Sequence, residues 1–329
     1  MGQFVGAAFA WRLAKGIARY VLRLAGTMAG TTLAVFLLIE VSISGGFRAV
    51  VFPAGPNPNS ERDQALVEIF HLDTNVMQRW LSWMLDAIQG DFGFSMRERA
   101  SVWDLVGPRL SISGELMLVG VVATLLIGVP MGLLAAAWSR RRAGRLIDGV
   151  LGLSQALPIF VTPYVLIWLF ALELGWLPAA TWVRPTVSLS DHLRHLVLPV
   201  VSLVLAEFGA IGRIVRADVL RVLEQDYIVS AVGKGLSTRF ILFRHALRPA
   251  SLGLLNIVGL NIGSMLSGAV VIELIFGIGG LGRLLFESTI NRDLNLILAL
   301  TTYMVVVFVT LGAIVDILTR ALDPRISER

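Results

Sequence analysis

Six long apolar stretches constrain the fold of this chain more than any other feature of its sequence. Each has about 20 or more mainly apolar residues, enough for a helix to cross a hydrocarbon core of roughly 30 Å. In lipid, a helix satisfies its backbone hydrogen bonds within one segment. The sequence therefore predicts an all-α membrane protein with six transmembrane helices. The predicted spans are Leu24–Ser44, Ser113–Trp138, Ile147–Leu172, Leu196–Val215, Leu252–Phe276 and Leu296–Thr319.

The composition agrees with a protein that lies in a membrane. Of its 329 residues, 56% are hydrophobic and 16% are charged, whereas a soluble domain has roughly a quarter charged residues. This excludes a disordered chain and, despite the net charge of +5, a nucleic-acid-binding domain. The chain has no cysteine, which excludes a disulfide framework, a thiolate metal site and a cysteine nucleophile.

The basic residues predict the orientation of the spans. With the N-terminus inside, 18 of the 28 lysines and arginines fall in the cytoplasmic segments. Six of the others lie in one long outer loop, and long loops cross the membrane largely regardless of their charge. Both termini are therefore expected in the cytoplasm.

The residues before the first span form a region of their own, 1–23. Four basic residues, at spacings of 3, 4 and 4, share one face of a helix. We expect an amphipathic helix on the inner membrane surface, followed by a transmembrane domain at 24–329. A cleaved signal peptide is not expected, because no apolar core precedes the A-x-A-like site. The basic residues are Arg12, Lys15, Arg19 and Arg23.

The long outer loop, 45–110, has two helical stretches, around 60–70 and 76–89. Together with Trp80, Trp83 and Trp103 they predict a small cap at the membrane surface. We hypothesise that this cap contacts a partner protein on the outer side.

The longest inner connection, 217–250, predicts an amphipathic helix–turn–helix. Apolar residues from Val219 to Val232 recur at helical spacing, and glycines at 233 and 235 then break the helix. Ser237 can cap a second helix, which Pro249 ends. The apolar face could pack on the chain's own spans or dock on a cytoplasmic partner, and periodicity alone does not separate these alternatives.

The inner connection contains the string Asp226–Gly235, followed by His245–Arg248. This pattern resembles the D-Y-x-x-x-A-x-A-K-G…H-A-L-R form of the EAA signature, which is typical of the ABC importer permeases of the dipeptide/oligopeptide/nickel family. The sequence departs from it at Val229, where the generic signature has Glu, and at Gly233, where Ala is usual. Other matching strings are Arg19-Tyr20, Gly90–Ser95, Leu174–Pro178, Gly280–Leu285 and Asp323–Arg325.

The resemblance implies a type I ABC importer permease fold with a coupling helix between the fourth and fifth spans. This helix would sit in a groove of a cytoplasmic ATPase, with Tyr227 and Ala231 forming an apolar ridge and Gly235 the turn. The chain lacks G-x-x-x-x-G-K-[ST], so no cofactor is expected in it, and ATP and Mg would be bound by partner ATPases. The implied coupling residues are Asp226, Tyr227, Ile228, Ala231, Lys234, Gly235 and His245.

The resemblance also implies the location and the partners of the chain. It would lie in a bacterial inner membrane as a multi-pass subunit and not be an enzyme. The implied partners are a second, different permease, two ATPases and an extracytoplasmic substrate-binding protein. The solute would be a peptide or, alternatively, nickel or another small solute.

The fifth predicted span carries polar residues that suit a wetted translocation path. The alternative is that they form hydrogen bonds between packed helices. Glu207 is a further acid within a span, and Arg213 is one candidate partner for it. The candidate path residues are Asn256, Asn261, Ser264, Ser267 and Glu273.

Two sequence patterns look like a dinucleotide-binding motif and a metal site. Gly277–Gly282 spells G-x-G-x-x-G, but it follows a membrane span and not a strand, so we expect an outer turn,. His192 and His195 lie next to Asp191, yet no third ligand is near in the sequence, and we expect solvated histidines,.

Two other classes of function remain as alternatives at this point. A proton-coupled secondary transporter would use the acids within the spans as a relay, and its uptake would not depend on ATP. An intramembrane enzyme has no support from a paired Asp or a Ser–His placement in facing spans.

Overall fold

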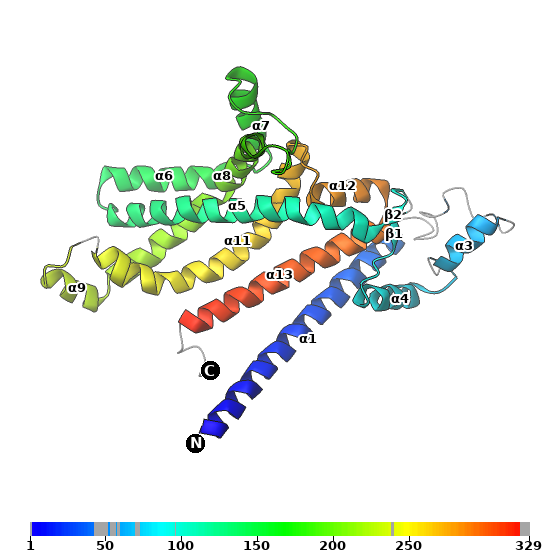
Figure 1. Ribbon diagram of the computed structural model, residues 1–329. Coiled ribbons are helices and arrows are strands. Elements are labelled where there is room, and N and C mark those ends of the chain that lie inside the picture. Colours follow the sequence, from blue (N-terminus) through cyan, green and yellow to red (C-terminus); the bar gives the residue numbers. More distant parts are fainter. Residues whose placement is uncertain are drawn as a thin grey trace. The chain divides into compact units, whose positions relative to one another are not determined.

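The computed structural model describes residues 2–42, 52, 57, 60–69, 73–95, 97–237 and 240–322. Over these residues the chain is mostly helical (Figure 1). The helices are α1 (Gly2–Ser42), α3 (Glu61–Ile69), α4 (Val76–Ile88), α5 (Val102–Ala137), α6 (Arg142–Ala156), α7 (Val161–Leu166), the π-helix η1 (Ile167–Glu173), α8 (Leu189–Leu223), α9 (Asp226–Gly233), the π-helix η2 (Ile241–Ala246), α11 (Leu247–Ile275), α12 (Leu281–Asn291) and α13 (Leu294–Leu322).

Four helices among the described residues are long and apolar enough to cross a membrane. They lie in α1, α5, α8 and α13, at four of the predicted spans. The bent pair α6 and α7–η1 would be a fifth candidate span if its two helices count as one. Residues Asn261–Ile275 of α11 form a shorter apolar helix. The fold is thus the expected helical membrane protein.

The third predicted span is not one straight helix. α6 and the α7–η1 helix are bent by 106°. Leu157 at the bend is extended, with ψ 121°, as expected for a residue before a proline, here Pro158. The sequence predicted an apolar helical stretch of about this length, but it did not predict the bend within the stretch.

The N-terminal region is continuous with the first span. α1 runs without a break from Gly2 to Ser42, through the described parts of the segment 1–23 and of the first apolar stretch. Its apolar part, Tyr20–Leu38, is the candidate span. The placement of 1–23 on the inner membrane surface stays a prediction.

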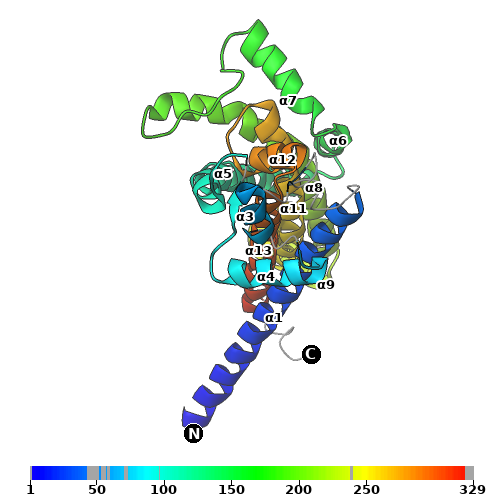
Figure 2. The ribbon, with the colours of Figure 1, turned by 90° about the vertical axis from the view of Figure 1, so that its right-hand side faces the viewer.

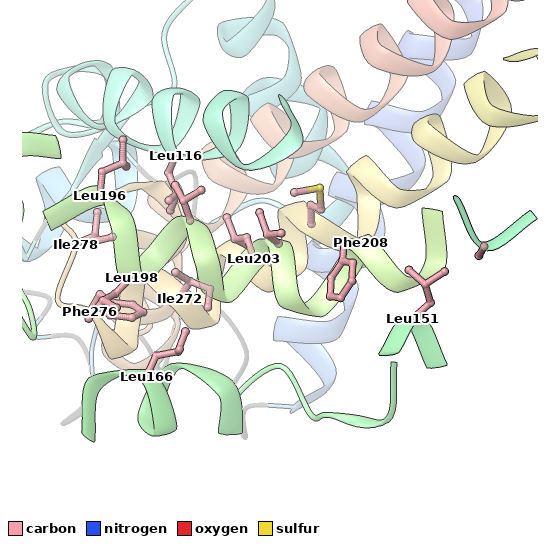
Figure 3. Close-up of a cluster of buried hydrophobic side chains, with 14 residues drawn as sticks. Leu116, Leu151, Leu166, Leu196, Leu198, Leu203, Phe208, Ile272, Phe276 and Ile278 are labelled. Atoms are coloured by element: carbon pink, nitrogen blue, oxygen red, sulfur yellow. The ribbon is translucent and has the colours of Figure 1, made fainter. Parts of the chain in front are cut away.

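The chain divides into two compact units. The first comprises Met1–Pro108 and Leu285–Thr310, and the second comprises Arg109–Leu284 and Leu311–Arg329. In the second unit, α8 packs on α6, α7 and α11. Figure 3 shows the resulting core, in which Leu203 and Phe208 of α8 are surrounded by side chains such as Leu116, Leu151 and Ile272.

Glycines let the helices of the second unit approach closely. A Cβ at Gly128 of α5 would lie 2.9 Å from the carbonyl oxygen of Phe208 in α8. A Cβ at Gly132 would overlap the carbonyl oxygen of Gly212, and one at Gly209 would overlap that of Leu151 in α6. Small residues are therefore required at both helix crossings on α8.

In the first unit, α4 packs on α1. The Trp80 indole Nε1–H donates to Thr32 Oγ1 at 3.0 Å, and the ring of Trp83 lies edge-on to Phe36. Figures 1 and 2 show α4 lying across α1, near the end of α1 that Ser42 closes.

The G-D-x-G-x-S string forms a small hairpin in the first unit. Its strands β1 (Phe94–Ser95) and β2 (Ala100–Ser101) pair antiparallel. The Asp91 carboxylate accepts from the Gly93 amide at 2.8 Å, and Ser95 Oγ contacts the Asp293 carboxylate, just before α13, at 2.5 Å. The string therefore closes a turn and ties it to the start of the last helix.

Candidate functional site

The connection between α8 and α11 forms a small helix–turn–helix. α8 ends at Leu223, and α9 covers Asp226–Gly233. The chain then turns at Gly235, whose φ of +74° is a conformation that glycine adopts without strain,. η2 starts at Ile241 and leads directly into α11. The predicted segment 217–250 thus has α9 and η2 on either side of a glycine turn.

One side of α9 packs on its own segment. Ile228 and Ala231 are 3% and 8% exposed and form a cluster with Ile241, against which Val222 and Leu223 pack. The ridge of Tyr227 and Ala231 suggested by the sequence does not match this burial. Ala231 is buried together with Ile228, three residues before it, whereas Tyr227, four residues before it, is exposed.

The other sides of α9 expose apolar side chains. Tyr227, Val229 and Val232 are 48%, 64% and 59% exposed. Two further apolar residues, Leu236 and Phe240, are also exposed after the glycine turn. Large apolar residues concentrated on a short exposed segment are typical of a surface that another protein covers.

The polar residues of the predicted coupling set lie around this surface. Asp226 and Lys234 are exposed at the two ends of α9. His245 belongs to η2, but its side chain lies outside the described residues.

Among the described path candidates, Ser264 links α11 to α8. Ser264 Oγ donates to Glu207 Oε1 at 2.7 Å, and Glu207 is buried. The expected partner, Arg213, is exposed, and the described residues show no ion pair between the two. The pairing of Glu207 with Arg213 was therefore wrong.

The other path candidates differ in exposure. Ser264 and Ser267 are exposed on α11, and Asn261 is partly buried, with its Nδ2 lacking a hydrogen-bond partner in the described part of the chain. The side chain of Asn256 lies outside that part. Ser267 Oγ donates to the Gly263 carbonyl oxygen at 3.4 Å, so both exposed serine hydroxyls have a partner within the chain.

Glu273 holds the turn that follows α11. It is 1% exposed. Ser113 Oγ donates to its Oε1 at 2.6 Å, and the Arg283 amide donates to its Oε2 at 3.0 Å. The same Ser113 Oγ accepts from the Leu281 amide at 2.8 Å. Two side chains from other helices thus satisfy amides at the start of α12, which a helix cannot satisfy internally. A role in the path stays a prediction for Glu273.

The glycines of the G-x-G-x-x-G string make this arrangement possible. A Cβ at Gly280 or Gly282 would overlap the Glu273 carboxylate or the backbone of Val270. The string lies between α11 and α12, and the strands in the described residues are far away in sequence, at Phe94–Ser95 and Ala100–Ser101. It is the expected turn and not part of a βαβ unit.

His192 is not the solvated histidine that was expected. It is 2% exposed, with Nδ1 2.7 Å from the Val183 carbonyl oxygen and Nε2 2.7 Å from Glu115 Oε1. Because a carbonyl oxygen only accepts, Nδ1 carries a proton. The Trp182 ring lies edge-on to the imidazole. The cluster ties the segment before α8 to α5, and no sequence signal links residues 77 positions apart.

The described residues contain no group of three His, Cys, Asp or Glu side chains that could hold a metal ion. The polar clusters found here are hydrogen-bonded pairs between helices. The exposed side of α9 is an apolar surface on the connection between α8 and α11.

Comparison with known proteins gives consistent similarities. Residues 128–328 match the family described as "Binding-protein-dependent transport system inner membrane component". The chain is 33% identical to the oligopeptide transport system permease protein AppB of Bacillus subtilis, over 95% of this chain and 99% of that protein. It is 30% identical to the glutathione transport system permease protein GsiC of Escherichia coli, over 94% and 98%.

A solved structure shares the fold. The inward-facing MetNI methionine ABC transporter matches with a TM-score of 0.56 at 16% identity, over 66% of this chain and 96% of the matched chain. This match concerns the arrangement of the helices alone.

Proposed function

The chain belongs to the family of binding-protein-dependent transport system inner membrane components, and from this premise we propose how it works in a peptide importer. It is a permease subunit of an ABC importer, an integral membrane protein that relies on separate ATPases. The relatives named for oligopeptides and glutathione favour a peptide as the solute. Nickel or another small solute is the alternative.

The observation that carries the mechanism is the exposed apolar side of α9. Tyr227, Val229 and Val232 would enter a groove of a cytoplasmic ATPase, while Ile228 and Ala231 hold α9 to the end of α8 and to η2. Because η2 runs directly into α11, a displacement of α9 would act on α8 and α11 together. This gives the ATPase a lever on the two helices that carry Glu207 and Ser264.

The proposed topology has six spans with both termini in the cytoplasm. α11 would be the fifth span, with 29 residues from Leu247 to Ile275, and the bent pair α6 and α7–η1 would be the third. The order of the helices and the positive-inside bias support this topology. It places α9 on the ATPase side and α4 on the outer side.

The proposed path lies along the polar face of α11, with Asn256, Asn261, Ser264 and Ser267 on its lining. The serine hydroxyls on this face are hydrogen-bonded within the chain, whereas Asn261 Nδ2 has no partner in the described residues and would be met by water or another protein,. A second, different permease would face this side, and the two would form the gated path. A substrate-binding protein would deliver the solute from outside, and the outer loop is its proposed contact.

Affinity purification of this chain from its native membrane tests the assignment. We expect a second permease, two ATPase subunits and a substrate-binding protein to co-purify. Uptake in cells should stop on ATP depletion and persist when an uncoupler collapses the proton gradient while ATP is maintained. The opposite pattern would indicate a secondary transporter.

A further inference from the structure

The surface of α4 divides into three sectors along the helix. The sector that packs on α1 contains Trp80 and Trp83. A second sector carries the exposed polar residues Gln78, Asp86 and Gln89. The third is apolar and exposed, and we call it the free apolar sector. Its residues are Met77, Leu81, Leu85 and Ile88, which are 49%, 48%, 61% and 73% exposed.

The free apolar sector is a continuous stripe. At 100° per residue its four residues fall within about 80° of one another, and the polar sector begins directly beside them. A helix with an apolar stripe bordered by a polar one is suited to the boundary between lipid and water.

The contacts of α4 place it at such a boundary. It touches α1 at Thr32 and Phe36, and Glu40 is the first charged residue that follows Arg23 along α1. At 1.5 Å per residue these contacts lie about 12 Å and 6 Å before Glu40, which we expect near the edge of the hydrocarbon core. Interfacial helices lie about 5–10 Å deep, in the same zone.

A row of aromatic rings continues from α4 to the start of α5. Trp83 contacts Phe92 at a ring distance of 6.5 Å, and Phe92 stacks on Trp103 at 6.4 Å. Trp103 is 57% exposed. Exposed tryptophans concentrate at membrane–water interfaces, where an amphipathic ring is favoured.

We propose that α4 is an interfacial helix whose free apolar sector is immersed in the lipid headgroup–acyl boundary at the Ser42 end of α1. In the proposed topology this is the outer leaflet. The polar sector then faces water, where a binding protein could approach it. The lipid contact goes beyond the permease function and would fix the outer loop against the first span.

The absence of cysteine in the chain permits a direct test. Single variants Met77→Cys, Leu81→Cys, Leu85→Cys and Ile88→Cys are compared with Gln78→Cys, Asp86→Cys and Gln89→Cys on the polar sector. A membrane-impermeant maleimide–polyethylene glycol reagent is added to spheroplasts, and the gel shift of this chain alone is followed. We expect the apolar positions to react at least about tenfold more slowly than the polar ones, with or without the binding protein.

A second measurement tests whether lipid or another protein covers the free apolar sector. Each cysteine is labelled with an environment-sensitive fluorophore and the complete importer is reconstituted with phospholipids brominated along their acyl chains. Quenching at the apolar positions and not at the polar ones is expected. Equal reaction rates on both sectors would overturn the proposal, as would slow reaction without quenching.

Protection of the apolar positions only when the binding protein is present would instead make this sector a protein-docking surface and overturn the lipid contact. ATP-dependent uptake by the labelled importer is measured in parallel. If α4 proves not to contact lipid while the importer still takes up solute with ATP, only the proposal about α4 is wrong. If uptake does not depend on ATP, the proposed permease function is wrong, whatever the result for α4.

Discussion

The two exposed valines of α9 offer the sharpest mutational test of the ATPase contact. In the double variant Val229→Ala, Val232→Ala the helix keeps its fold, because both side chains point away from its buried core and Ala favours helix more than Val,. We expect insertion and thermal stability of the subunit to stay unchanged. The affinity for the ATPase should fall.

The size of the effect follows from the exposed fractions. Val229 and Val232 are 64% and 59% exposed, so a groove that covers them completely would bury about three fifths of each. Removing two methyl groups costs about 1.6 kcal/mol on full burial, hence about 1 kcal/mol for each valine. Together, about 2 kcal/mol corresponds to an affinity about 25-fold weaker.

The assay titrates purified ATPase onto the permease complex in nanodiscs and records Kd for the parent and the variant. Val187→Ala is the matched control, since Val187 is 77% exposed in the connection before α8. Its Kd should equal the parent's. A double variant within twofold of the parent would refute the argument that these valines enter the groove.

Three further substitutions test the packing around the site. Ser113→Ala removes the hydroxyl that links Glu273 to the start of α12. The Glu273 Oε1 atom and the Leu281 amide then lose this partner, which should lower the free energy of unfolding by about 2–5 kcal/mol. The expected readout is a lower midpoint temperature in thermal unfolding. Gly209→Ala places a Cβ against the Leu151 carbonyl. This should separate α6 from α8 and lower the same midpoint temperature. An unchanged midpoint would show that the two helices move apart at no cost in stability. Ala231→Arg forces a charge into the core of the α9 segment; it should expose that segment to limited proteolysis, and unaltered protection would contradict the assigned burial.

The sequence predicted the helical membrane fold well, because apolar length is a local property. The described parts of the first, second, fourth and sixth predicted stretches coincide with one long helix each, except Trp138, which follows the end of α5. The third was harder, because a proline shows that a helix is disturbed but not in which direction the chain continues. Pro158 accounts for the position of the bend before α7, but the angle of 106° was known only from the structure.

The sides of α9 show a second limit of sequence patterns. Apolar spacing identified a stripe on the helix but not what covers it. Ile228 and Ala231 are covered by Ile241, which lies beyond the glycine turn. Only the exposed fractions in the structure therefore show which side of α9 is left for the proposed ATPase contact. Contacts between distant positions, such as Ser113 with Glu273 or Glu115 with His192, leave no mark in a single sequence.

Cross-linking in the complete importer tests directly whether α9 is held by a separate ATPase. Val232→Cys is the probe and Val187→Cys the control in this chain, which has no cysteine of its own. With a short amine-to-thiol reagent, we expect a product between Val232→Cys and the ATPase and none from the control. A product from the control but not from Val232→Cys would contradict the proposed ATPase contact.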